Sequence, residues 1–152
     1  QPVFVDLDMN TVEPAIGAHR MEGIYAWKTM LDLGIHASGG SDAPVVSFDS
    51  MENIYFAVTR KNINGQPEEG WLPSEKLTVD EAVKLFTKYA AYASYTEEEN
   101  GTIEVGKHAD LVILEKDIYK IHPDDIKTTK VDMTILGGMT VYEREKRSRK
   151  RP

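Results

Sequence analysis

The stretch of sequence that decides the fold reads Gly34-Ile35-His36-Ala37-Ser38-Gly39-Gly40-Ser41-Asp42-Ala43-Pro44-Val45. The short apolar run at residues 35–37 predicts a buried strand. Small residues follow it, and Asp42 then lies in a Gly-Ser-Asp-Ala-Pro turn. A carboxylate just past the carboxyl end of a strand lies where α/β barrels hold their catalytic groups. The stretch therefore predicts an α/β fold and makes Asp42 the first candidate for chemistry.

The residues before this stretch predict a strand and a helix. The apolar run at residues 3–5 is typical of a buried strand. A helix is predicted over residues 21–33 and ends at Gly34, because apolar side chains recur at helical spacing: Ile24, Trp27, Met30 and Leu31. The order strand, helix, strand predicts a parallel crossover unit.

The residues after Asp42 predict two further helices. The first covers residues 51–60, and a loop rich in Gly and Pro follows over residues 62–73. Thr78 and Glu81 form a capping box that opens the second helix, which runs to about Ala91.

The pattern becomes β-rich after Gly101. Strands are predicted at residues 109–114 and 131–136, and residues 139–142 return as a hairpin across Gly137-Gly138. We therefore expect residues 1–100 to form an α/β part and residues 101–143 a small β part, followed by a basic, disordered tail at residues 144–152.

Composition limits the classes of partner. The net charge is −7, and because residues 144–152 carry +5, the remainder carries −12. An acidic body argues against general nucleic-acid binding, and no apolar run is long enough to cross a membrane. The basic tail could contact phosphates or lipids, although a solvated terminus is the simpler interpretation. The absence of cysteine fits a reducing compartment such as the cytoplasm.

Asp42 has two interpretations at this level. Its hard oxygen ligand suits zinc, manganese or iron, and the same group can take a proton from a metal-bound water. Alternatively, it only forms a turn or caps a helix. The histidines add no metal motif, since none stands in His-x-His or His-Glu-x-x-His spacing: His19, His36, His108 and His122. We interpret them as surface or packed histidines.

Two arginines could bind a substrate. Arg20, which precedes the first predicted helix, could hold a carboxylate or phosphate, or it could pair with nearby acidic residues. Arg60, at the end of the helix over residues 51–60, has the same two interpretations, and a cation is favourable at a helix C-terminus.

An ordered series of motifs is more specific than any one of them. The series reads Gly-Ser-Asp-Ala-Pro-Val (40–45), Ala-Val-Thr-Arg (57–60), Leu-Thr-Val-Asp-Glu-Ala (77–82), Thr-Lys-Tyr-Ala-Ala-Tyr-Ala-Ser (87–94), Gly-Thr-Ile-Glu-Val-Gly-Lys-His-Ala-Asp-Leu-Val (101–112) and Thr-Ile-Leu-Gly-Gly (134–138). Over residues 1–142 it closely resembles the C-terminal end of the amidohydrolase superfamily, in particular its type 3 branch.

This resemblance implies a metal-dependent hydrolase of amide, cyclic amide or related C–N bonds in small molecules. It implies the last part of a (β/α)₈ barrel for residues 1–100 and part of a composite β-sandwich for residues 101–143. Asp42 would end the eighth barrel strand, bind a divalent metal, with zinc the expected ion, and move a proton from the attacking water to the leaving group.

The resemblance also indicates which parts of the family's proteins this chain lacks. It begins at Gln1 and lacks the family's His-x-His motif and later histidines. We therefore expect a C-terminal fragment that is inactive alone, exposes apolar faces and strand edges, and can self-associate through them. The alternative function is a non-catalytic binding or assembly module that uses the acidic body and the basic tail.

Overall fold

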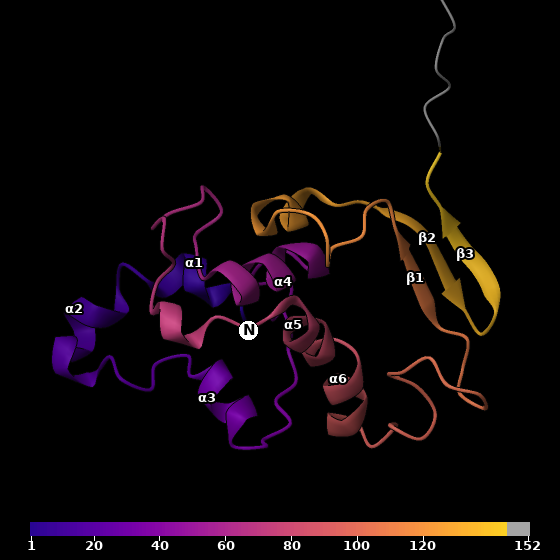
Figure 1. Cartoon of the computed structure of the whole chain (residues 1–152), viewed down its shortest axis with the longest axis horizontal. Coiled ribbons are helices and arrows are strands. Elements are labelled where there is room, and N and C mark those ends of the chain that lie inside the picture. Colours follow the sequence, from indigo (N-terminus) through magenta and orange to yellow (C-terminus); the bar gives the residue numbers. More distant parts are fainter. Residues whose placement is uncertain (146–152) are drawn as a thin grey trace, which may run out of the picture.

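The computed structural model describes residues 1–145, so most of the predicted basic tail lies outside the described residues. The helices lie at one end of the molecule and a small sheet at the other (Figure 1). The elements are α1 (Phe4–Asp8), α2 (Val12–Ile16), η1 (Ala18–Arg20), α3 (Trp27–Asp32), α4 (Ser50–Thr59), η2 (Pro73–Glu75), α5 (Val79–Leu85), α6 (Lys88–Ala93), β1 (Leu111–Leu114), η3 (Pro123–Thr128), β2 (Val131–Leu136) and β3 (Met139–Glu143). This mixture of helices and strands confirms an α/β fold.

The helices of residues 1–145 are all too short or too polar to pass through a lipid bilayer.

The sheet confirms the predicted β-rich part. Its strands are antiparallel in the order β1-β2-β3. The β2–β3 turn places Gly137 and Gly138 at φ +56° and +81°, which is the conformation that a two-residue hairpin requires. Asp110 supports this turn, because its carboxylate accepts the N–H of Gly137 at 2.7 Å. The Ala-Asp pair of the 101–112 motif therefore has a structural role in the hairpin.

The hydrophobic core is built around α4. Its residues 53–59 are buried on every side, with Tyr55 and Ala57 fully inaccessible to solvent. α5 packs against it through Ala82 and Leu85. The chain after β1 then folds back over α4, where η3 inserts the fully buried Ile126 (Figure 1). The helix predicted over residues 51–60 is thus confirmed to within one residue at each end, and it unites both parts of the chain.

The capping box is confirmed, but the helix that it opens is shorter than predicted. The Thr78 hydroxyl accepts the N–H of Glu81 at 3.2 Å, and the Glu81 carboxylate accepts the N–H of Thr78 at 2.8 Å. α5 ends at Leu85 instead of near Ala91, and α6 starts afresh at Lys88. At the break, the Thr87 hydroxyl donates to the Val83 carbonyl at 2.9 Å, a local bond that competes with helix continuation.

The crossover unit predicted before Asp42 is wrong. Residues 4–8 form α1 instead of a strand, and residues 35–37 pair with no strand among those that the structure describes. An extended segment becomes a strand only when a second segment takes up its hydrogen bonds. The helix predicted over residues 21–33 is reduced to α3, because Gly23 and Tyr25 take positive φ values of +84° and +50°.

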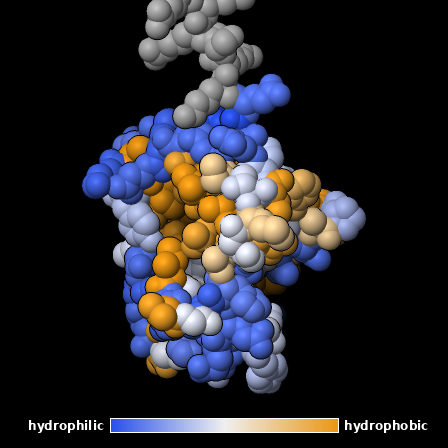
Figure 2. Space-filling model, turned by 90° about the vertical axis from the view of Figure 1, so that its right-hand side faces the viewer, coloured by the Kyte–Doolittle hydropathy of each residue, from blue (hydrophilic) through white to orange (hydrophobic). Residues whose placement is uncertain are grey.

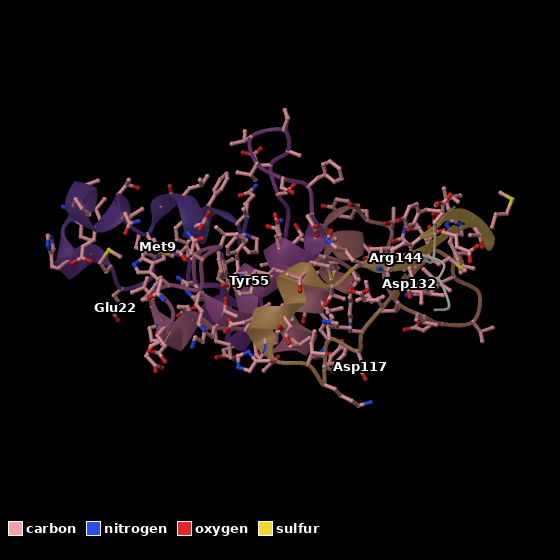
Figure 3. All side chains as sticks on the ribbon, turned by 90° about the horizontal axis from the view of Figure 1, so that it is seen from above. Met9, Glu22, Tyr55, Asp117, Asp132 and Arg144 are labelled. Carbon is pink, nitrogen blue, oxygen red and sulfur yellow. The ribbon has the colours of Figure 1, made fainter. Side chains whose placement is uncertain are left out.

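Arg144 follows β3 directly and is hydrogen-bonded to neighbouring residues of the sheet region. Its Nε donates to Asp132 at 2.8 Å, and its Nη2 donates to Glu115 at 2.8 Å (Figure 3). The predicted disordered tail at residues 144–152 stays a prediction, because residues 146–152 lie outside the described part of the chain.

The predicted exposure of apolar surface is confirmed. Figure 2 shows apolar side chains gathered on the face at the sheet end of the molecule. Several sheet residues are more than half exposed: Val112, Leu136, Met139 and Val141. A small protein rarely leaves such a group of large side chains in water.

Candidate active site

The segment that leads to Asp42 starts from a defined helix end. α3 ends at Asp32, and Gly34 follows with φ +80°. The N–H of Gly34 donates to the Leu31 carbonyl and the N–H of Ile35 donates to the Met30 carbonyl, each at 2.9 Å. This is a Schellman motif, in which glycine supplies the left-handed conformation. The predicted stop at Gly34 is confirmed.

Contacts with α5 and α6 hold the same segment in place. The N–H of Gly39 donates to the Leu85 carbonyl at 2.9 Å. The His36 ring stacks on Tyr89, with centroids 4.9 Å apart and planes at 12°, and meets the edge of Tyr92 at 4.9 Å. His36 is thus a surface histidine that packs against two tyrosines, as the interpretation of surface or packed histidines predicted.

Gly39→Ala should displace the Asp42 loop. A Cβ at Gly39 would lie 2.7 Å from Cζ of Phe86, which is closer than carbon atoms approach. We expect this overpacking to lower the free energy of unfolding by about 1–3 kcal/mol, measured by urea denaturation. Gly40→Ala is the matched control, since a Cβ there meets nothing within 4 Å. Equal losses in the two variants would contradict a role for the Phe86 contact.

Asp42 itself is exposed at the tip of the loop and has φ +58°. Its carbonyl accepts the N–H of Val45 at 2.9 Å, whereas its carboxylate accepts no hydrogen bond within residues 1–145. The loop thus presents an exposed carboxylate that is not used in any hydrogen bond among the described residues.

The remaining predicted site residues do not gather around Asp42. Arg20 is exposed at the end of η1. His19, His108 and His122 are also exposed, and His122 accepts the N–H of Asp124 at 3.3 Å as the cap of η3. Over residues 1–145, no group of three or more His, Cys, Asp or Glu side chains could hold a metal ion. Asp42 offers one suitable oxygen ligand, but the described residues do not complete a metal site.

Two pockets lie away from the Asp42 loop. One of about 290 Å³ is lined by residues that include Met9, Asn62 and Trp71. The other, of about 520 Å³, lies between the segment at residues 21–24 and η2. Met9 lines the first pocket and Glu22 lines the second. Both residues lie at the end of the molecule opposite Asp132 and Arg144 (Figure 3). Neither pocket could be predicted from the sequence, because each is lined by segments that are distant along the chain.

These features define a mixed α/β protein with one exposed, unpaired carboxylate in a loop that packing holds in place. Residues 1–142 match the model of the Amidohydrolase family. The chain belongs to this family.

Individual relatives agree with the family. The chain is 38% identical over 144 residues to a putative amidohydrolase, YtcJ, of Bacillus subtilis, covering 95% of this chain and 27% of that protein. It is 34% identical over 121 residues to an N-substituted formamide deformylase of Arthrobacter pascens, covering 80% of this chain and 22% of that protein. The chain therefore spans about a quarter of the length of these relatives.

A solved structure has a similar fold. An amidohydrolase from Thermotoga maritima superposes with a TM-score of 0.54 at 20% identity, over 80% of this chain and 26% of that one. At this level of identity the likeness concerns the fold alone.

Proposed function

We propose that the protein containing this chain hydrolyses the C–N bond of an amide, a cyclic amide or a related small molecule, with Asp42 as a catalytic residue. The observation that carries the proposal is the Asp42 loop, in a chain that matches the Amidohydrolase family from residue 1 to residue 142. The Arthrobacter relative, named for the removal of formyl groups from N-substituted formamides, supports this class of substrate.

The chemistry assigned to Asp42 is proton transfer. Its carboxylate is exposed and accepts no hydrogen bond among the described residues, so an oxygen is free to take a proton from the attacking water. The same oxygen then gives this proton to the leaving nitrogen as the C–N bond breaks. Gly39 and His36 hold the loop, which lowers the cost of placing the carboxylate beside the reacting atoms.

A divalent metal, with zinc the expected ion, belongs to the proposal for the complete protein. A hydrolytic zinc site takes about three protein ligands, and residues 1–145 bring no group of three or more His, Cys, Asp or Glu side chains together, around Asp42 or elsewhere. The residues of this chain thus do not fit a complete site. We propose that the other ligands come from residues outside this chain and that the isolated chain is inactive.

The architecture of the complete protein is part of the same proposal. Residues 1–100 would form the last part of a (β/α)₈ barrel, and residues 101–143 would form part of a β-sandwich. The segment at residues 35–37, which pairs with no strand among the described residues, and the exposed apolar sheet residues support this arrangement, because further strands would cover both. The proposal has three further parts. The chain would self-associate through these exposed faces, and Arg20 would bind an anionic group of the substrate. The protein would be cytoplasmic and would have no nucleic-acid or membrane partner.

Activity and metal content test the proposal together. We expect the protein produced from the complete reading frame to contain a divalent metal, to release amine from N-substituted formamides or to open cyclic amides, and to lose this activity to a chelator and regain it with zinc. The isolated 152-residue chain should show neither turnover nor stoichiometric metal. If the isolated chain binds zinc and turns over substrate, the other metal ligands do not come from outside this chain. If the complete protein is fully active without metal, the proposed metal dependence is wrong.

A further inference from the structure

The most unusual buried group in the molecule is the guanidinium of Arg60, at the C-terminal end of α4. The Arg60 side chain is completely buried. Its Cζ lies 4.7 Å from the ring centroid of Trp27 and 5.5 Å from that of Trp71. Tyr25 packs against both indoles, with its ring centroid 5.7 Å from each. These aromatic residues form what we call the Arg60 cage, an arrangement of the kind that binds organic cations.

Backbone carbonyls complete the binding of this cation. Arg60 donates from Nε to the Trp71 carbonyl at 2.6 Å and from Nη1 to the Tyr25 carbonyl at 2.9 Å. Its own carbonyl accepts the N–H of Trp71 at 2.7 Å. No carboxylate forms an ion pair with Arg60 within the described range, and its buried Nη2 has no hydrogen-bond partner there. Ring faces and carbonyl oxygens therefore replace the water and the counter-ion that a buried charge needs.

The charge on Arg60 persists at neutral pH. Burial lowers the pKa of its guanidinium to about 10, and the charges of Glu75 and Tyr25 act in the opposite direction. The side chain therefore remains a cation under physiological conditions.

Glu75 also connects the segments at residues 25–29 and 71–75, which contribute the aromatic residues of the Arg60 cage. Its carboxylate accepts the N–H of Thr29 at 3.0 Å and the Thr29 hydroxyl at 2.5 Å. It thereby caps α3, whose own N-cap residue, Ala26, has no side chain that can do so. Burial raises the pKa of Glu75, but its hydrogen bonds with Thr29 and Lys28 and the charge of Arg60 outweigh this effect, so the pKa is lowered. The segments at residues 25–29 and 71–75 thus meet around Arg60 and Glu75.

We propose that Arg60 is a positioning residue that serves as the internal ligand of the Arg60 cage, fixing α3 and the loop at residues 61–72 against α4. The cage is then a guanidinium-binding site that the chain fills itself. The pocket of about 520 Å³ is lined by residues 21–24, which lie next to the first joined segment, and by Thr29, Leu72, Ser74 and Glu75 from the two segments themselves. Arg60 would therefore also influence the width of that pocket. This proposal does not depend on hydrolysis, and its test requires no substrate.

Chemical rescue tests the proposal directly. The chain contains two tryptophans, Trp27 and Trp71, and both line the cage, so indole fluorescence reports on it. We expect Arg60→Ala to lower the thermal unfolding midpoint by roughly 10 °C and to shift the emission to longer wavelength as water enters. N-ethylguanidinium at low millimolar concentration should reverse the emission shift saturably and raise the midpoint.

Matched controls make the response specific. Ethylammonium and sodium chloride at equal concentration should not rescue Arg60→Ala, because neither supplies a planar, forked donor. Arg144→Ala, which removes an arginine that contacts no aromatic ring among the described residues, should leave the emission unchanged and should not respond to N-ethylguanidinium. Rescue by ethylammonium to the same extent, or no response to N-ethylguanidinium in a folded Arg60→Ala chain, would overturn the proposal.

Arg60→Lys decides the question if Arg60→Ala does not fold. Lysine keeps the positive charge but cannot donate to both carbonyls while stacking between two indoles. We expect Arg60→Lys to shift the tryptophan emission to longer wavelength and to lower the thermal unfolding midpoint relative to the unchanged chain. If Arg60→Lys keeps the emission and the midpoint of the unchanged chain, the guanidinium does not position these segments.

Discussion

Asp42→Asn should reduce kcat/KM of the complete protein by about 10³-fold or more and should leave its thermal unfolding midpoint unchanged. Asparagine has the shape of aspartate and tolerates the left-handed conformation that Asp42 adopts, with φ +58°. It cannot accept the proton of an attacking water or pass it to a leaving nitrogen. The measurement is steady-state kinetics on an N-substituted formamide, together with metal analysis and a thermal unfolding curve for the same preparation.

The neighbouring Asp49 provides a matched control for this experiment. It is also an exposed carboxylate, and it caps α4 by accepting the N–H of Met51 at 2.8 Å. Asparagine caps a helix about as well as aspartate, so Asp49→Asn should change kcat/KM by less than about twofold. If Asp42→Asn loses no more activity than Asp49→Asn, the carboxylate at residue 42 only forms a turn, and the proposed catalytic role is wrong.

Gly70→Ala should cause the largest loss of stability among single methyl additions to the loop at residues 61–72. Gly70 has φ +76°, and a Cβ there would lie 2.3 Å from the Thr59 carbonyl oxygen. That oxygen belongs to the buried end of α4 and cannot move away without disturbing the core. We expect the free energy of unfolding to fall by about 3 kcal/mol or more, measured by urea denaturation of the 152-residue chain.

Gly65→Ala is the control that measures the cost of backbone strain alone, without the steric clash expected in Gly70→Ala. Gly65 lies in the same loop with φ +84°, but a Cβ there meets nothing within 4 Å. Its replacement should therefore cost only the strain of a left-handed alanine, about 1 kcal/mol. Equal losses for Gly65→Ala and Gly70→Ala would show that the close approach to Thr59 does not matter.

The features that could be predicted from the sequence have local causes. The capping box of Thr78 and Glu81, the Schellman end at Gly34 and the hairpin across Gly137-Gly138 each need only a few consecutive residues. The helix now seen as α4 was predictable because its apolar periodicity lies within the helix itself. The order of motifs along the chain indicated the family, and Asp42 became a candidate through the same motifs; its catalytic role stays a prediction.

The features that could not be predicted depend on partners distant in sequence. The segment at residues 35–37 has the composition of a strand, but pairing requires a neighbouring strand, and the described residues contain none beside it. The sequence left Arg60 with two interpretations, a substrate-binding arginine or one paired with acidic residues at a helix end. It could not predict that Trp27 and Trp71 bury the guanidinium, because both are distant along the chain.

The sequence by itself determined the helix caps, the hairpin and the family of this protein, because hydrogen bonds between near neighbours and apolar periodicity are properties of local sequence. Only the tertiary structure decided that Arg60 is buried between Trp27 and Trp71 and that the side chain of Asp42 is exposed to solvent. Burial and electrostatic environment depend on which distant segments meet, and that choice minimises the free energy of the whole chain and not of any one segment.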